Sequence, residues 1–483
     1  MSSELAALRS LVDRCLLLGF DGTTLPDDLK AWLAEGLGGV IVFGGNIDSP
    51  EQLATLTAQI HANGDDVLVA ADEEGGDVTR LHHRDGCPYP GNLALGWMDD
   101  EAATHAVATA IGQELAAVGV NLDLAPVADV NTNPDNPIIG TRSFGSDPEL
   151  VARHVVAYVQ GMAEAGVAGC LKHFPGHGDT AVDSHLALPT IQGDRSALEP
   201  HLAPFRAGIA AGVPAVLSAH IVFPALDSQP GTLSRRILTG LLRDELGFDG
   251  AVVTDSLTMD AIAREFGVAE GAVGALAAGA DLLCINSDLE THRAVRDRIV
   301  AAVRAGELSE ARLVEAADRV RTLRDRFAPG SGSNEPNPAA TGAGGSIETV
   351  RDRLLLRDAS LPLAGSPYVV EVAPPRRGIE LTAGSLLATM RRIAPDVDGI
   401  RWYARESADE PVAPPEGRPL VLVVRDAHRD PEQRAIIERF PTATVVGIGT
   451  HDDGALAAGR YLGTHGGARP NLTAAAEQLL GRR

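Results

Sequence analysis

Aromatic side chains are scarce in this chain, since phenylalanine, tyrosine and tryptophan together make up 4% of its 483 residues. Hydrophobic residues as a whole make up 45%. Any core must therefore be built mainly from Ala, Val, Leu and Ile, which is an ordinary composition for a globular protein.

Cysteine is rare as well. The chain has four cysteines, which are Cys15, Cys87, Cys170 and Cys284. Three of the four lie inside apolar runs. Because they are far apart and mostly apolar in context, we interpret them as buried thiols rather than as disulfides or metal ligands.

Basic residues are in deficit, with 41 Lys and Arg against 65 Asp and Glu and a formal net charge of −24. No basic stripe interrupts this acidic balance. Nucleic acid and anionic membrane would not be attracted electrostatically, so neither is expected as a partner.

Long apolar runs are missing too, because no segment approaches the ~20 apolar residues of a membrane span. The opening stretch MSSELAALRSLVDRCLLLGF carries an acidic residue early, and it lacks a basic region and a small-residue cleavage pattern. We therefore predict no signal peptide and a cytoplasmic location.

What the chain does contain is a regular alternation of short apolar runs with longer segments of helical period. Eight such runs occur before residue 290; they are Cys15 to Phe20, Gly38 to Phe43, Asp66 to Asp72, Val120 to Pro126, Ala168 to Phe174, Pro214 to His220, Gly250 to Asp255 and Ala280 to Asn286. Eight strand–helix units predict a (β/α)₈ TIM-type barrel, although a doubly wound sheet would alternate in the same way.

Polar residues at the ends of these runs favour the barrel. They stand at the last position of a run or beside it, and they are Asp72, Lys172, His173, His220, Asp255 and Asn286. A barrel gathers its active site at the carboxyl ends of its strands, whereas chance would scatter polar residues over both ends.

A second domain is expected after a linker. Residues 329–346 are rich in Pro, Gly, Ser and Asn, and apolar runs restart at Pro367, Pro419 and Thr442. This pattern predicts a catalytic barrel over 1–328, a flexible linker over 329–346 and a smaller α/β domain, an αβα sandwich, over 347–483.

Asp255 ends a short β-branched run, GAVVTD. A carboxylate on such a rigid support is suited to act as a nucleophile or general base. The alternative is that Asp255 caps a helix beginning near Thr258. Asp72, which ends DVLVAAD before EEGG, allows the same two interpretations.

The loop LKHFPGHGDTAVDSHLALP, from Leu171 to Pro189, is crowded with titratable groups and leaves three interpretations open. One is a metal site, for which the possible ligands are His173, His177, Asp179, Asp183 and His185; the spacing matches no zinc signature. A second is structural, with His173 and His177 bonded to the backbone. The third is acid/base catalysis by Asp183 and His185, whose side chains share a face of an extended segment.

Five motifs together carry a resemblance to a known family. They are KHFPGHGDTAVDSH, DEEGGDVTRL from Asp72, IIGTRSFG from Ile138, SAHIVFPALD from Ser218 and LRDELGFDGAVVTDSLTMDAI. The chain resembles glycoside hydrolase family 3, in its β-N-acetylglucosaminidase branch, and the order of barrel and sandwich extends the likeness over nearly the whole chain.

The resemblance implies a role for each matching position. Asp255 matches the nucleophile that forms a glycosyl-enzyme with net retention, and His185 matches the acid/base, with Asp183 as its partner. The positions that match sugar-binding residues are Asp72, Arg80, Arg142, Lys172 and His173. No metal or other cofactor is implied.

The activity implied is exo-acting hydrolysis of terminal N-acetyl-β-D-glucosaminides from muropeptides or chitin-derived oligosaccharides, in the context of cell-wall recycling. The small-molecule partner would be an amino-sugar glycoside, and the sequence leaves the oligomeric state open. A phosphorylase that uses inorganic phosphate at the same site is the nearer alternative. A β-glucosidase and a non-catalytic sugar-binding protein are further ones.

One motif departs from the family pattern. Family members commonly have DQEGGRV where this chain has DEEGGDV, so Glu73 and Asp77 replace an amide and a base. If Asp77 lies near the sugar, the substrate preference would be affected.

Overall fold

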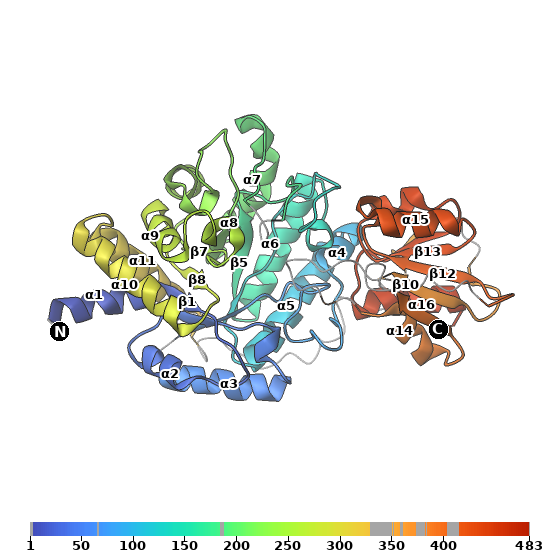
Figure 1. The fold of residues 1–483 in the computed structure, drawn as a ribbon, viewed down its shortest axis with the longest axis horizontal. Coiled ribbons are helices and arrows are strands. Elements are labelled where there is room, and N and C mark those ends of the chain that lie inside the picture. Colours follow the sequence, from blue (N-terminus) through green and yellow to red (C-terminus); the bar gives the residue numbers. More distant parts are fainter. Residues whose placement is uncertain are drawn as a thin grey trace.

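The chain folds around two separate sheets, one of eight and one of six strands (Figure 1). The computed structural model describes residues 3–64, 67–183, 188–328, 350, 352–357, 361–372, 382, 384–402 and 415–482. The predicted linker, 329–346, lies outside the described residues. The last helix before it ends at Arg326 and the first strand after it begins at Leu355.

The first sheet is a closed parallel barrel. Its strands are β1 (Leu16–Leu18), β2 (Gly39–Ile41), β3 (Leu68–Ala71), β4 (Leu122–Asp123), β5 (Ala168–Phe174), β6 (Ala215–Ser218), β7 (Ala251–Thr254) and β8 (Leu283–Ile285). Each strand pairs with the next in the chain, β8 pairs with β1 through Leu16 and Leu283, and a bridge from Val253 to Leu282 closes the ring. The eight predicted runs are thus confirmed as the eight strands of a barrel.

Helices surround this barrel, as the alternation predicts. They are α1 (Ser3–Asp13), α2 (Asp27–Ala34), α3 (Pro50–Asn63), α4 (Asn92–Met98), α5 (Glu101–Ala117), α6 (Pro148–Glu164), α7 (Arg195–Ala210), α8 (Asp260–Ala263), α9 (Val268–Ala278), α10 (Leu289–Ala305) and α11 (Glu310–Arg326). With them are the short 3₁₀ helices η1 (Gly44–Asn46), η2 (Gly140–Arg142) and η3 (Gly231–Leu233) and the π-helix η4 (Arg236–Glu245). Several begin at a side-chain cap, such as Ser49 before α3 and Asp147 before α6.

The barrel interior is filled with small and aliphatic side chains. Among them are Ala70, Ala168, Ala215 and Ala251, one from each of four strands. Phe327, just after α11, packs into the same cluster. A core poor in rings is what the composition requires, and all four cysteines are buried and free, as expected.

A buried carboxylate fastens the amino-terminal end of β8. Asp281 has no exposed surface, and its oxygens accept hydrogen bonds from Arg243 (2.6 Å), Arg312 (2.7 Å) and the backbone N–H of Val252 (2.9 Å). These partners come from η4, α11 and β7, so the cluster ties two surrounding helices to the ring far from its carboxyl ends.

The second sheet has the order β11-β10-β12-β13-β14-β9, parallel except for β9. Its strands are β9 (Leu355–Arg357), β10 (Tyr368–Val372), β11 (Asp398–Trp402), β12 (Leu420–Val424), β13 (Thr444–Gly447) and β14 (Tyr461–Gly463). The helices and turns with it are α14 (Leu386–Ile393), α15 (Pro431–Arg439), α16 (Arg469–Leu480), η5 (Ala427–Arg429) and η6 (His451–Leu456).

Both faces of this sheet are covered. Val369, Val421 and Val446 pack with α14 and α16, whereas their strand neighbours Val370 and Leu422 pack with α15. This alternation is that of an αβα sandwich, as predicted. Only β10, β12 and β13 were expected; β9 and β14 span three residues each, and β11 is an edge strand with partly exposed residues.

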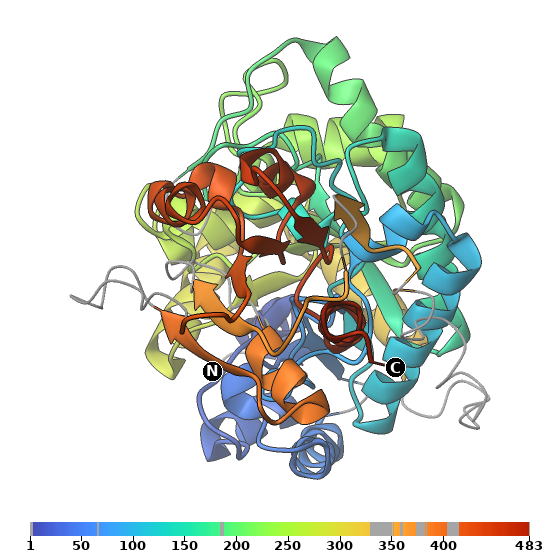
Figure 2. The ribbon, with the colours of Figure 1, turned by 90° about the vertical axis from the view of Figure 1, so that its right-hand side faces the viewer.

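The sandwich contacts loops and α4 on the side of the barrel where β3 and β4 end. Figure 2 looks from that side, with the sandwich in front of the barrel. Its His428 lies 2.9 Å from the carbonyl oxygen of Pro134, and the N–H of Arg469 donates to the carbonyl of Cys87. Within the described ranges, no helix is both long and apolar enough to traverse a bilayer.

Candidate active site

A cavity of about 450 Å³ opens at the carboxyl ends of the barrel strands. Its polar lining comes from the ends of five strands or the loops after them; it includes Asp72, Glu74, Arg80, Arg142, Lys172, His173, Asp255, Ser256 and Asn286. Phe43, Leu217, Met259 and Cys284 supply apolar surface. A concave, partly apolar site with convergent polar groups is typical of a small-molecule site.

Asp255 follows β7 directly and lines this cavity. Its Oδ1 accepts a hydrogen bond of 2.8 Å from the N–H of Ser256. The helix that follows, α8, begins at Asp260 with Met259 at its N-cap, so the alternative interpretation of Asp255 as a helix cap is wrong. The carboxylate is therefore carried on a strand end and is part of the cavity wall.

His220, at the end of β6, does not line the cavity although it stands at a strand end. Its ring is buried, with Nδ1 at 2.8 Å from Thr232 Oγ1 and Nε2 at 3.0 Å from the carbonyl oxygen of Ser256. It therefore supports the turn that carries Asp255.

Ion pairs cross the cavity wall between the β3 and β5 strand ends. Lys172 Nζ donates to Asp72 (2.7 Å) and also lies 2.6 Å from Glu74. Arg142 binds Glu74 in a two-bond fork, 2.9 and 2.8 Å long, while Arg80 lies 3.4 Å from Asp72. Acid and base thus alternate through a connected network, which fixes each side chain in position.

The network keeps its acids ionised. Burial raises the pKa of Asp72, but the charges of Lys172 and Arg80 outweigh burial and hold it well below its usual range. Burial likewise opposes ionisation of Glu74, yet Arg142 and Lys172 lower its pKa to about 2. The carboxylates therefore stay charged and remain hydrogen-bond acceptors over the neutral and mildly acidic range.

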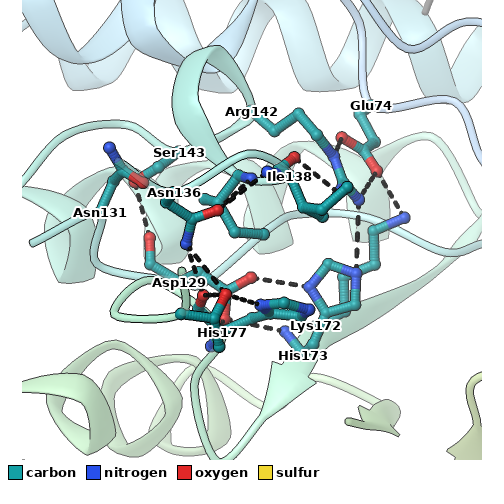
Figure 3. Close-up of polar contacts among 12 residues, drawn as sticks. Glu74, Asp129, Asn131, Asn136, Ile138, Arg142, Ser143, Lys172, His173 and His177 are labelled. Carbon is teal, nitrogen blue, oxygen red and sulfur yellow. Dashed lines mark hydrogen bonds and ion pairs between the residues drawn. The ribbon is translucent and has the colours of Figure 1, made fainter. Parts of the chain in front are cut away.

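A second series of hydrogen bonds, drawn in Figure 3, leads from Asp129 through His173 to the guanidinium group of Arg142. Asp129 accepts from His173 Nδ1 (2.7 Å), and Arg142 Nη2 lies 3.3 Å from His173 Nε2. Because an arginine only donates, Nε2 is the acceptor and the proton is on Nδ1. Asp129 is thus the group that orients His173 toward the cavity.

His177 holds the loop after β5 in shape. Its backbone N–H donates to Asp129 (2.6 Å), and its ring Nδ1 lies 2.8 Å from Thr180 Oγ1. Burial, with the adjacent His173, lowers the pKa of His177 to about 4. Within the described ranges, no group of three or more His, Cys, Asp or Glu is placed to hold a metal ion.

Of the predicted acid/base pair, only Asp183 lies in the part of the chain that the structure describes. Asp183 is buried, but it is not among the residues that line the cavity. His185 lies outside the described residues. The structure therefore brings together six of the eight predicted site residues, namely Asp72, Arg80, Arg142, Lys172, His173 and Asp255.

Two further residues of the site were not predicted from the sequence. Glu74 stands in the quoted DEEGG motif, and Asp129 follows the fourth apolar run in PVADV. The signal for each was present, an acidic residue just after a barrel strand. Their partners come from other strands, and that pairing is not visible in the sequence.

The two residues that depart from the family motif do not line the cavity. Glu73 is buried, and its Oε2 accepts from the backbone N–H groups of Arg80 (2.7 Å) and Leu81 (3.0 Å). Asp77 does not line the cavity, so the expectation that it would lie near the sugar is wrong; it pairs with Arg425 of the sandwich at 2.7 Å.

Solved structures and curated proteins resemble this chain over most of its length. A family 3 β-N-acetylglucosaminidase structure from a Paenibacillus species is 34% identical, with a TM-score of 0.88, and the match covers 98% of this chain and 97% of that one. A β-glucoside phosphorylase structure has a TM-score of 0.79 at 19% identity, a likeness of fold alone.

Curated relatives give the same picture. A β-hexosaminidase of Alkalilimnicola ehrlichii is 40% identical over 290 residues, which is 58% of this chain and 82% of that protein. The β-hexosaminidase A of Pseudoalteromonas piscicida is 32% identical over 74% of this chain, and the match spans 65% of its length. The model of the glycosyl hydrolase family 3 N terminal domain matches residues 14–323. This chain therefore belongs to glycosyl hydrolase family 3.

Proposed function

We propose that the chain is a retaining exo-β-N-acetylglucosaminidase, which releases terminal N-acetyl-β-D-glucosamine from muropeptides or chitin-derived oligosaccharides. The observation that supports this most directly is that Asp255, at the end of β7, lines the same cavity as the Asp72–Lys172–Glu74–Arg142 network. A carboxylate nucleophile and a fixed set of hydroxyl-binding groups are the two parts that such a reaction needs.

In the first step Asp255 attacks the anomeric carbon while the aglycone leaves with a proton. The proton donor in this proposal is His185, oriented by Asp183, since an imidazole titrates near neutral pH and can both give and take a proton. In the second step His185 takes a proton from water, which displaces Asp255 and restores the original anomeric configuration.

The ion-pair network holds the sugar. Asp72 and Glu74 are ionised acceptors for paired hydroxyls, and Lys172 and Arg142 are donors to oxygen. His173 presents Nε2 beside Arg142, and Phe43 and Met259 supply apolar surface along the wall. Because carboxylates and cations alternate, a neutral sugar can replace water without leaving any charge unpaired.

Turnover of an aryl N-acetyl-β-glucosaminide tests the proposal. We expect wild-type protein to release the aryl group and Asp255→Ala to lose the activity. Asp249→Ala removes an exposed carboxylate just before the other end of the same strand, and it should turn over like the wild type. An inert wild type would instead favour a non-catalytic sugar-binding protein.

The acceptor is tested by product analysis with and without inorganic phosphate. Lys172, Arg142 and Arg80 each face a carboxylate in the cavity, so an added anion meets balanced rather than excess positive charge. We expect free N-acetylglucosamine at a rate independent of phosphate. A sugar 1-phosphate product would show that the enzyme is a phosphorylase.

The role of His185 is tested by varying the leaving group. Glycosylation by His185→Ala should stay fast with an acidic phenol, which departs without a proton, and should slow strongly with a poor leaving group. Pre-steady-state release of the phenol measures this step. Equal slowing with both substrates would contradict the acid assignment.

A further inference from the structure

A buried carboxylate joins the sandwich to the barrel directly behind the sugar-side ion pairs. Asp77 Oδ2 accepts from Arg425 Nη1 (2.7 Å) and from Thr141 Oγ1 (2.8 Å), and Oδ1 accepts from the N–H of Gly467 (2.7 Å). The N–H of Thr382 donates to the Asp77 carbonyl (2.7 Å). The side chains of Asp77 and Arg425 are each 2% exposed, so the pair is closed to solvent.

On one side, Asp77 is fixed to Glu74 by a tight turn. The N–H of Glu74 donates to the Val78 carbonyl (3.0 Å), and the N–H of Val78 donates to the Gly75 carbonyl (3.2 Å). Gly75 and Gly76 have φ values of 77° and 61°, which glycine adopts at little cost. Asp77 therefore cannot shift without moving the residue that binds Lys172 and Arg142.

On the other side, Asp77 is tied to Arg142. Thr141, which donates to Asp77, is the residue immediately before Arg142 in η2. Glu74 and Arg142 are themselves joined by the two-bond fork. The carboxylate of Asp77 is thus linked to both Glu74 and Arg142. The sandwich supplies two of the hydrogen-bond donors to this carboxylate.

We propose that Asp77 and Arg425 form a positioning pair, through which the sandwich domain fixes the Glu74–Arg142 side of the sugar cavity. This deepens the proposed function and rests on the assignment of that cavity to a sugar. Neither residue lines the cavity, so the pair acts through Glu74 and Arg142 rather than on the substrate.

The charge of Arg425 is what keeps Asp77 in place. A buried carboxylate that loses its cation is strongly disfavoured, and the surrounding backbone relaxes to reach water or another cation. Here the backbone directly attached to that carboxylate is the turn that carries Glu74. Removing Arg425 should therefore misplace the fork and weaken sugar binding, while Asp255 on β7 keeps its place.

The experiment compares the full-length wild type with Arg425→Met, Arg425→Lys and Asp77→Asn. The control is His428→Ala, which removes another contact between sandwich and barrel, at Pro134. The measurements are KM and kcat on the aryl N-acetyl-β-glucosaminide, the Kd of N-acetylglucosamine by calorimetry, and the melting temperature of each variant.

We expect Arg425→Met to raise KM and Kd roughly tenfold with kcat within about threefold, the signature of lost uniform binding. Arg425→Lys should recover part of this loss, and His428→Ala should leave both constants within about twofold of the wild type. Should Arg425→Met not fold, Asp77→Asn decides, because its single amide oxygen can still accept from the N–H of Gly467 while its uncharged NH₂ group faces Arg425 and Thr141.

A folded Arg425→Met or Asp77→Asn variant with wild-type KM and Kd would overturn the proposal, whatever its melting temperature. A change in KM and Kd no larger than that caused by His428→Ala would also overturn the proposal, since the pair would then contribute no more than any other contact between the two domains. A wild type that cleaves an aryl β-glucoside but not the N-acetyl compound would contradict the proposed function alone, and the same comparison is then made on the glucoside. A wild type that binds no sugar would overturn both.

Discussion

At the scale of single residues, the site depends on carboxylates that do not touch the cavity. Asp129 is fully buried and accepts from the ring and backbone of His173 and from the backbone of His177. Glu73, which stands between Asp72 and Glu74 in the sequence, is buried as well. Each makes a different and measurable contribution.

Asp129→Asn should impair activity by moving the ring proton of His173 from Nδ1 to Nε2. If the amide oxygen keeps its backbone donors, its NH₂ faces Nδ1, which puts the ring proton on Nε2 against Arg142. We expect kcat/KM to fall at least about tenfold, or about 1.4 kcal/mol of transition-state stabilisation. Steady-state kinetics measures this, with the exposed Asp135→Asn as control. Wild-type kcat/KM in a folded Asp129→Asn would show that His173 needs no such partner.

Glu73→Gln should stabilise the protein at high pH. Burial raises the pKa of Glu73, and its Oε1 has no hydrogen-bond partner among the described residues. A raised pKa means that the favourable contribution of Glu73 is present below its unfolded pKa and is lost as pH rises through the folded one.

Glu73→Gln does not ionise, so the variant does not lose stability in this way as pH rises. It should therefore gain about 1 kcal/mol over the wild type at pH 8, roughly 2–4 °C in Tm for a domain of this size, and nothing at pH 4. Calorimetric melts at both pH values measure this. A difference that is the same at both values would contradict the assignment of the effect to ionisation.

At the scale of elements, the loop after β5 is held by close backbone contact rather than by helix or strand bonding. A Cβ at Gly178 would lie 1.8 Å from the carbonyl oxygen of Val130, which no side-chain movement can relieve. The loop after β4 and the loop after β5 are thus packed backbone to backbone; they carry Asp129 and His177, which lie against His173 at the end of β5.

Gly178→Ala should separate these loops and misplace His173. We expect a kcat/KM loss of about tenfold or more and a stability loss of ~1–3 kcal/mol, as for other overpacked sites. Gly240→Ala adds the same methyl in η4, where the nearest atom is 4.0 Å away, and it is the control. The prediction would be contradicted if Gly178→Ala kept wild-type activity and its crystal structure showed both loops in place, because the backbone at Val130 would then accommodate the added methyl group.

The elements themselves were largely predictable. Parallel barrel strands are buried on both faces, so they form continuous apolar runs that stand out in the sequence. The sandwich strands β9, β11 and β14 are short or lie near an edge, and their runs do not. Polar strand ends located the cavity, whereas the bond between Asp77 and Arg425 joins residues 348 positions apart, and no local pattern indicates it.

At the scale of the whole molecule, a histidine pair marks the contact between domains. Trp97 of α4 stacks on His465 with ring centroids 4.9 Å apart, and His451 meets it edge-on at 4.4 Å. Burial and the neighbouring His451 lower the pKa of His465 to about 3, and burial also lowers that of His451. Both rings therefore favour their neutral forms in the folded protein.

The contact between domains should weaken in acid. In the folded protein the pKa values of His451 and His465 lie below the unfolded value of about 6.5. The stability that the two neutral rings contribute is therefore present above that pH and is lost as pH falls toward 3. Trp97 is 41% exposed and is one of only three tryptophans, so its fluorescence should change between pH 6 and 4. Trp97→Phe should remove the transition and His465→Gln should flatten it. An identical pH profile for wild type and Trp97→Phe would contradict the prediction.

The pairing of β1 with β8 has a consequence for how the molecule is made. Leu16 of the first strand meets its partner Leu283 only after the other strands of the barrel have been synthesised, so the ring stays open until then. Arg425 arrives later still. The turn that carries Glu74 thus gains its bonds to Arg425 and Gly467 only after the barrel has been synthesised, and a nascent chain halted after the barrel would contain the described residues of the cavity wall without the brace behind them.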